Sequence, residues 1–151
     1  MSAVIPYIVA NAMKGALLAS YARRCVFLGG DFVDIDALLE SDRGNGNPPV
    51  CIVCEEVGAA NRTTCRAWVV DIGIEVISPR DQSYELAAGE AAGVFHVVES
   101  AEEAFRQRIE WGGKFLVGKF EPIAQAVRTV ESIRFISSTY RIRLGPKPPA
   151  S

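Results

Sequence analysis

The clearest hydrophobic pattern in the chain is an alternation over residues 67–76. Five large apolar residues share one parity: Trp68, Val70, Ile72, Ile74 and Val76. Successive side chains of a strand point to opposite faces, so this pattern predicts a long strand that buries one face and ends at Pro79. The preceding PVCIVCEEV is apolar and β-branched, which predicts a second strand. GAANRT between the two is typical of a hairpin loop.

Helical patterns begin near the N-terminus. A helix is predicted from Pro6, which suits a first turn, to about Arg24. Its buried stripe follows a loose three-to-four spacing through Ile5, Ile8, Ala12, Leu17 and Tyr21. DIDALLESD predicts a short second helix capped by Asp34 or Asp36. GNGNPP, residues 44–49, is expected to be an exposed loop.

A further helix is predicted within DQSYELAAGEAAGVFHVVES, capped by Asp81 or Ser83. Its apolar stripe consists of Tyr84, Ala87, Ala91, Val94 or Phe95, and Val98. Ser100 and Glu103 have the spacing of a capping box, which predicts a separate short helix over 101–111.

The C-terminal part predicts a short strand over 114–120 and a long last strand over 127–144. Ile136, Tyr140, Ile142 and Leu144 share one face of the last strand. Ile133 and Phe135 have the opposite parity, so a bulge or bend is expected near Ser137–Ser138. The fold class is therefore α+β, with a mostly antiparallel sheet of about four strands and an N-terminal and a central helix packed on it. The chain reads as one domain, 1–151, with residues 1–4 and 145–151 extended or mobile.

Composition agrees with an ordinary soluble globular domain. The 151 residues are 49% hydrophobic and 23% charged, with a formal net charge of -2. This charge gives no reason to expect nucleic-acid binding driven by overall charge. Asn11 and Lys14 interrupt the apolar N-terminal segment, which argues against a secretory signal. No apolar run is long enough for a membrane span, so no membrane partner is expected.

The sulfur-bearing segment allows two interpretations. Cys51 and Cys54 are three apart on a predicted strand, so their side chains should point to opposite faces. A zinc knuckle needs a turn between its cysteines, and a redox motif needs a helix start, and neither is indicated here. We therefore predict no metal site, while a small zinc or thiol protein using Cys51, Cys54 and Cys65 remains the alternative.

No catalytic constellation is found, so neither an enzyme nor a cofactor is expected. His96 is the single histidine and lies in a predicted helix without a nearby nucleophile motif. The glycines of GNGNPP lack the Gly-Lys-Ser/Thr ending of a phosphate loop. The acidic residues around Asp36 match no calcium loop. Basic residues of the last strand would contact phosphates only, because no aromatic residues are interleaved for base stacking.

The order of elements resembles the tail terminator (tail completion) proteins of long-tailed bacteriophages. The segments that carry the resemblance span about residues 5–144: PYIVANAMKGALLASYA, PPVCIVCEEV after a variable loop, AWVVDIGIEVISP, YELAAGEAAGVFHVV and IRFISSTYRIRL. In such proteins the long strand is followed by a helix rich in small residues that packs on the sheet. The resemblance is one of element order and pattern rather than of an invariant motif.

This resemblance implies a virion structural protein located at the head-proximal end of the tail, assembled in the host cytoplasm. It implies a homo-oligomeric ring, of six subunits, that stops tube polymerisation. The implied partners are the tail tube protein, a head-side neck or connector protein, and DNA that passes through the lumen without sequence-specific contacts. A ring requires a heterologous, closing interface. Candidate interface or lumen residues are Arg128, Arg134, Arg141, Arg143, Asn45, Asn47, Asn61 and Arg62. Another phage neck or tail-tube component is a further alternative.

Overall fold

The computed structural model describes residues 4–21, 25–30, 34–44, 48–63, 67–108, 115–116 and 119–145. The helices are α1 (Ile5–Ser20), α2 (Ile35–Gly44) and α3 (Tyr84–Arg108). The strands are β1 (Cys25–Leu28), β2 (Cys51–Glu56), β3 (Asn61–Arg62), β4 (Trp68–Pro79), β5 (Phe115–Leu116), β6 (Glu121–Val130) and β7 (Ile133–Gly145). The predicted α+β class is confirmed, with more strands than the four expected.

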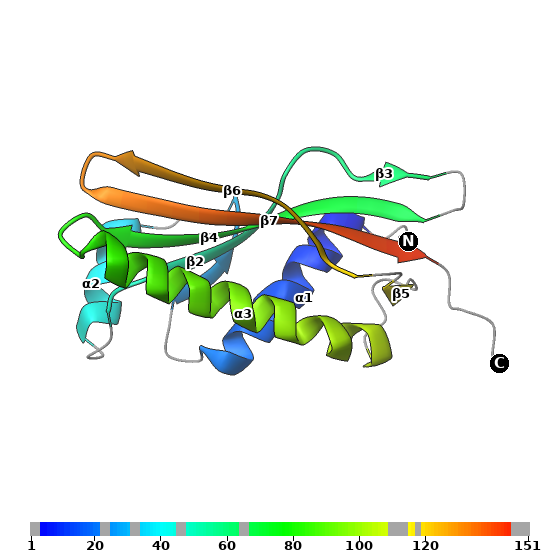
Figure 1. Cartoon of the computed structure of the whole chain (residues 1–151), viewed down its shortest axis with the longest axis horizontal. Coiled ribbons are helices and arrows are strands. Elements are labelled where there is room, and N and C mark those ends of the chain that lie inside the picture. The colour runs from blue at the N-terminus through cyan, green and yellow to red at the C-terminus, as the bar shows by residue number, and fades with distance from the viewer. Residues whose placement is uncertain are drawn as a thin grey trace.

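The described strands form one mixed sheet of order β1-β2-β4-β7, in which β5 and β6 both pair with β7 and β3 pairs with β4. Only β1 and β2 run parallel, and the other pairs are antiparallel. The long strands β4 and β7 lie side by side through the middle of the molecule (Figure 1). The predicted hairpin is confirmed, since β2 pairs antiparallel with β4. The loop that connects these two strands contains the short strand β3.

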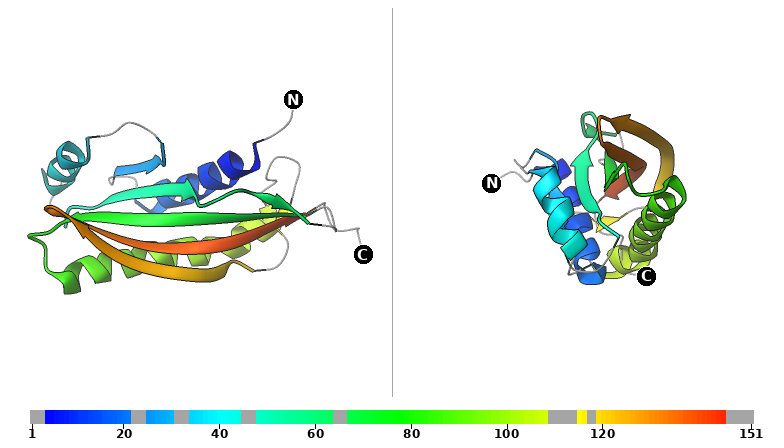
Figure 2. Two further views of the ribbon diagram at one scale, coloured as in Figure 1. Left: turned by 90° about the horizontal axis from the view of Figure 1, so that it is seen from above. Right: turned by 90° about the vertical axis from the view of Figure 1, so that its left-hand side faces the viewer.

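The main core lies between one face of the sheet and the helices α1 and α3. The predicted alternation of β4 holds, because Val70, Ile72, Ile74 and Val76 are all buried in this core. On the other face, α2 covers only one end of the sheet. There Leu39 packs with Cys51, Val53 and Ile77 in a second cluster. Viewed from this end, α2 and α3 lie on opposite sides of the sheet (Figure 2, right).

The prediction of a single last strand over 127–144 is wrong. The chain reverses at Glu131–Ser132, so that β6 and β7 form a hairpin. The expected bulge near Ser137–Ser138 is also wrong, because the β4–β7 register runs unbroken from Ile133 to Leu144. Ile133 and Phe135 have the opposite parity for another reason: they pack against the second cluster beside α2. Both faces of the sheet are buried at this end.

The predicted helix over 101–111 is wrong as a separate element. Helix α3 runs without interruption through Ser100 to Arg108, and the Ser100 hydroxyl lies 3.4 Å from Nε2 of His96, one turn back. The N-terminal cap of α3 is Ser83, whose hydroxyl accepts the N–H of Leu86 at 3.2 Å. For α2, Asp34 accepts the N–H of Ala37 at 3.1 Å and is the cap.

The predicted helical stripes are largely confirmed, with two adjustments. In α3, Ala87, Ala91, Val94, Phe95 and Val98 are buried. Tyr84, which was expected to belong to this stripe, is 53% exposed. In α1 the stripe is centred on Val9 and Met13, and it includes Ile5 and Leu17 as expected. The strand expected over 114–120 is reduced to β5 within the described residues.

Candidate assembly surfaces

The largest polar feature is the face of the sheet that α2 leaves open. The pairing register places Asp71 opposite Arg141 and Glu75 opposite Ser137, with Glu121 beside Arg141 on the outer strand. Directly paired residues of antiparallel strands project from the same face, so these charged side chains share it. We call this charged surface the open face; it also includes Arg128 and Arg143.

The arginines of the open face are engaged with carboxylates. Arg141 donates to both oxygens of Asp71, with Nε 2.9 Å from Oδ1 and Nη2 3.1 Å from Oδ2. This hydrogen bonding and the charge of Asp71 raise the pKa of Arg141. Arg143 lies 2.9 Å from Glu121. A two-pronged arginine–carboxylate contact is among the stronger charged hydrogen bonds, so these side chains are held in position rather than freely extended.

The remaining two arginines point to different sides of the sheet. On the open face, Arg128 lies 3.5 Å from Glu75 and its guanidinium lies 4.0 Å from the ring centroid of Phe135. On the helix side, Arg134 donates to the carbonyl of Gln82 at 3.0 Å and lies 5.0 Å from the ring centroid of Tyr84. The four candidate arginines therefore do not form one basic patch.

Carboxylates crowd the middle of the open face. Glu55 of β2 pairs in register with Gly73, between the rows of Asp71 and Glu75. Burial, reinforced by Glu75 and Glu56 and opposed by Arg128, raises the pKa of the Glu55 carboxyl. The open face is thus a mixed, largely paired surface rather than a cationic one.

The two candidate loop residues that the structure describes, Asn61 and Arg62, project from opposite faces of the sheet. Asn61 lies in the same register row as Val69 and Arg143, which places it at the end of the open face. Arg62 pairs with Trp68 and projects from the opposite face. Asn45 and Asn47 lie outside the described residues.

The two strand cysteines project in opposite directions, as predicted. Cys54 is buried in the main core, and Cys51 is buried in the second cluster on the other face. Burial raises the pKa of the Cys54 thiol to about 12. Cys65 lies outside the described residues. Among the His, Cys, Asp and Glu residues that the structure describes, no group of three or more is suited to holding a metal ion.

Sequence reasoning missed a groove between α3 and β6. It has a volume of about 390 Å³, and its lining includes the polar residues Glu99 and Gln125. Its other lining residues include Tyr84, Ala88, Ala92 and Phe95 of α3, Val127 of β6 and Ile136 of β7. We call it the α3–β6 groove. Beside it, every residue of β6 is exposed, including Ile123, Val127 and Val130. The sequence does not predict the hairpin that creates this groove, because Glu131–Ser132 lacks the Asn-Gly or Asp-Gly pair of a strong hairpin signal and serine is only a weak turn residue.

A second missed surface is the outer side of α1. The N-cap and four exposed positions of this helix form one stripe, which we call the outer stripe: Val4, Tyr7, Asn11, Gly15 and Leu18. Ala19 and Ser20 at the end of the helix are exposed as well. Val4, Tyr7 and Leu18 are 64%, 55% and 38% exposed. None of the five is charged, and Lys14 is the single charged residue of the whole helix. A surface helix normally presents charged residues to solvent, so this pattern could have been read from the sequence as a helix covered on two sides.

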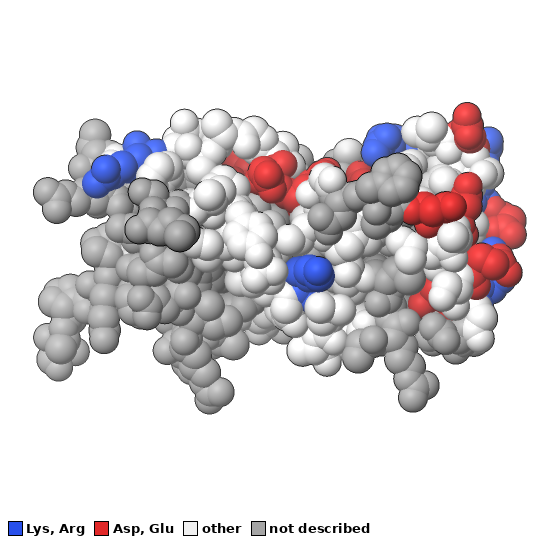
Figure 3. Space-filling model, turned by 180° about the vertical axis from the view of Figure 1, so that it is seen from behind, with Lys and Arg blue, Asp and Glu red and all other residues white. Residues whose placement is uncertain are grey.

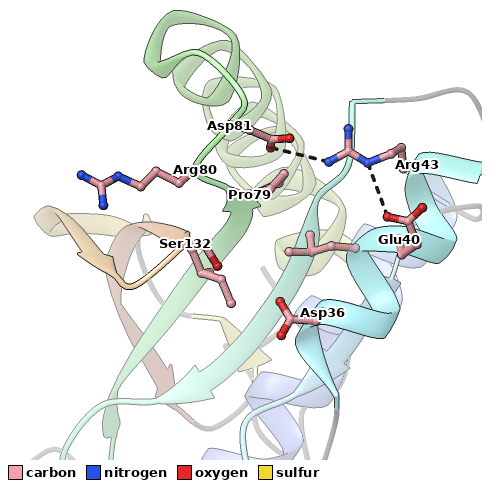
Figure 4. A pocket seen from close by; sticks show the side chains of 9 residues that line it. Asp36, Glu40, Arg43, Pro79, Arg80, Asp81 and Ser132 are labelled. Carbon is pink, nitrogen blue, oxygen red and sulfur yellow. Dashed lines mark ion pairs between the residues drawn. The ribbon is translucent and has the colours of Figure 1, made fainter.

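The back face carries charges of both signs. Figure 3 shows acidic side chains gathered at the end near α2 and further acidic ones along the upper middle, with basic side chains at both ends and in the centre. Near α2 lies a cleft of about 410 Å³ lined by Asp36, Glu40, Arg43, Asp81 and Ser132, among others. Arg43 reaches Glu40 at 3.7 Å and Asp81 at 3.6 Å (Figure 4). The ion pair with Asp81 connects α2 with the turn before α3, and the ion pair with Glu40 lies within α2. The charged residues of the cleft are therefore explained by a structural role.

No helix within the described part of the chain has the length and apolar character needed to cross a membrane.

Comparison with known proteins identifies the fold. No protein-family model and no curated protein matches the sequence. Among solved structures, the chain is similar to one from the virion of a native gene transfer agent (GTA) particle, with a TM-score of 0.61 and 20% sequence identity. The match covers 95% of this chain and 98% of that chain. At this identity the likeness establishes a shared fold over nearly the full length of both chains.

Proposed function

We propose that this chain is a structural protein of a phage-type virion and that it acts as a tail terminator. In this proposal, six copies form a ring on the last ring of the tail tube. The ring stops tube polymerisation and presents its other side to the head-side neck protein. The chain acts by assembly and performs no catalysis.

The observation that carries the virion role is the whole-length match to a chain of the GTA virion. The shared fold extends over 95% of this chain and 98% of the other, so it is not confined to one part of either. Fold alone does not fix function, so the terminator role rests in addition on the family resemblance of the sequence and on the surfaces described above.

Those surfaces support a homo-oligomer. The exposed outer stripe of α1 and the fully exposed strand β6 are both more apolar than solvent-facing elements usually are. The open face supports passage of DNA without tight contacts. Since Arg128, Arg141 and Arg143 each lie beside a carboxylate, they would hold phosphates less firmly than unpaired arginines.

The alternative of a zinc or thiol protein is weakened by the strand geometry. Two cysteines whose side chains lie on opposite faces of one strand cannot bind the same ion without disrupting the sheet. The shared fold supports the alternative role, another neck or tube component, equally well. The site on the particle where the protein binds distinguishes that role from the role of a tail terminator.

The test uses purified protein and its cognate tube protein. Light scattering after size-exclusion chromatography should report a ring, or a monomer that assembles only on tubes. Negative-stain microscopy should show density at one end of each tube, and tube growth should stop when the protein is added. Binding along the tube wall or to the neck protein alone would favour the other virion roles. A persistent monomer that never decorates tube ends would argue against the proposal.

A further inference from the structure

We infer that the outer stripe of α1 in one subunit docks into the α3–β6 groove of the next subunit. This inference rests on the proposed ring and specifies its subunit contact. It follows from two unpartnered surfaces whose shape, charge and position are complementary.

The first surface is a helix face without charge. Val4, Tyr7 and Leu18 expose large apolar side chains along the outer stripe of α1. Between them, a Cβ on Gly15 would meet no atom within 4 Å, so the backbone of α1 is open to close approach at this point. A helix that is apolar on both sides is normally buried on both sides.

The second surface is a groove with small walls. On α3, Ala88 and Ala92 line the α3–β6 groove, and exposed Gly89 lies beside them on the same helix. Small residues on a helix allow a second helix to pack closely. On the other wall, Val127 of β6 is 46% exposed and offers apolar contact. The residues of α3 that line the groove extend from Tyr84 to Glu99, about 22 Å along the helix axis, which is close to the length of about 24 Å of α1.

Charge favours this pairing over contact between identical surfaces. Lys14 is the single charged residue of α1. In contrast, the groove is lined by the carboxylate Glu99, and α3 has no lysine or arginine before Arg106. Two α1 helices or two α3 grooves would bring like charges together, whereas α1 against α3 brings opposite charges together.

The positions suit a ring. When the molecule is viewed from the end that carries α2, α1 lies on one side and α3 with β6 on the other (Figure 2, right). A closed ring requires two different patches on two different sides of the subunit, and these two surfaces meet that requirement.

The test begins with one substitution in each surface. Leu18→Lys places a charge in the outer stripe, and Ala92→Arg places a long charged side chain in the groove. Both positions are exposed, so both variants should unfold thermally like the unchanged protein. Each should lose the ring in light scattering, or lose tube-end decoration if assembly occurs only on tubes. The matched control is Val57→Lys, an equally exposed aliphatic position outside both surfaces, which should assemble normally. If Leu18→Lys fails to fold, Tyr7→Lys replaces it.

Mixing the two variants gives the decisive result. The Leu18→Lys variant retains an intact groove, and the Ala92→Arg variant retains an intact outer stripe. Together they should form a one-to-one dimer through the single remaining intact contact, and nothing larger. Analytical ultracentrifugation of the mixture and of each variant alone measures this.

The possible failures are distinguishable. Rings that survive both substitutions, or a mixture that stays monomeric while the unchanged protein forms rings, overturn the docking inference and leave the ring itself intact. Rings that persist but no longer attach to tubes show that another protein covers these surfaces, which also overturns it. An unchanged protein that neither forms rings nor binds tube ends overturns the proposed function together with this contact.

Discussion

The thiol of Cys54 offers the sharpest test of whether this chain is a scaffold or a reactive centre. Cys54 is fully buried in the main core, and burial raises its pKa from 9.0 to about 12, with Lys14 opposing the shift. Since the thiolate is the reactive species and each pKa unit changes its population tenfold, the thiolate fraction near neutral pH should fall about 1000-fold relative to an exposed cysteine. Steric protection by the core lowers the reaction rate further.

Alkylation with iodoacetamide, followed by peptide mass spectrometry, measures this at the single residue. In the native protein, Cys54 should be labelled at least about 1000-fold more slowly than in the urea-unfolded protein, which is the internal control. Labelling of native Cys54 within about tenfold of the unfolded rate would refute the reasoning, because it would require an exposed or activated thiol. Added zinc should not change the native rate, since Cys51 projects from the opposite face.

The same burial predicts a pH dependence of stability. The pKa of Cys54 is higher in the folded than in the unfolded protein, so the folded state favours the neutral thiol. This contribution is fully present below pH 9.0 and is lost as the pH rises toward 12. A Cys54→Ala variant should show a smaller loss of stability over this range, although it is less stable at neutral pH because it leaves a cavity.

Three further predictions concern stability measured by urea denaturation. Glu131, the first turn residue between β6 and β7, has a φ of 55°, which glycine adopts more readily than glutamate. Glu131→Gly should therefore raise the free energy of unfolding by about 0.5–1 kcal/mol, whereas Ser132→Gly, at a residue whose φ is not positive, should not. Equal effects at both positions would contradict this. Ile72→Ala in the main core should cost about 2–5 kcal/mol, against less than about 1 kcal/mol for Ile123→Ala on exposed β6, and similar losses would mean that β6 is buried in the isolated chain. Burial raises the pKa of Tyr140 to about 12, so the free energy of unfolding should decline as the pH rises from 10.0 toward 12. Tyr140→Phe should reduce that decline, and a pH profile that the substitution leaves unchanged would show that Tyr140 is not responsible.

The open face bears on how DNA could pass through the proposed ring. Its arginines are engaged with Asp71, Glu75 and Glu121. Ion pairs of this partly exposed kind contribute little to stability, typically below about 1 kcal/mol. Because of these ion pairs the open face has no strong net charge. Such a surface suits a ring wall along which DNA moves better than a site that binds DNA tightly.

Strong local patterns determined a large part of this fold from the sequence alone. The alternation in β4 specified both the strand and its buried face, since period two has one structural meaning over ten residues. The same periodicity placed Cys51 and Cys54 on opposite faces. The cap candidates Asp81 and Ser83 before a helical stripe located the start of α3 to within two residues, and Ser83 is the cap. In each case the information lies within a few neighbouring residues.

The tertiary structure alone decided the features that depend on distant segments. The turn at Glu131–Ser132 has only serine as a weak turn signal, and it forms because β7 pairs along the whole length of β4 while β6 pairs back onto β7. Ile133 and Phe135 are partly buried on the second face because α2, about ninety residues earlier in the chain, packs there. The α3–β6 groove and the outer stripe of α1 likewise exist because packing buries one side of each element and leaves the other exposed. Local periodicity reports which side chains avoid water, whereas the partner that covers them is set by long-range packing.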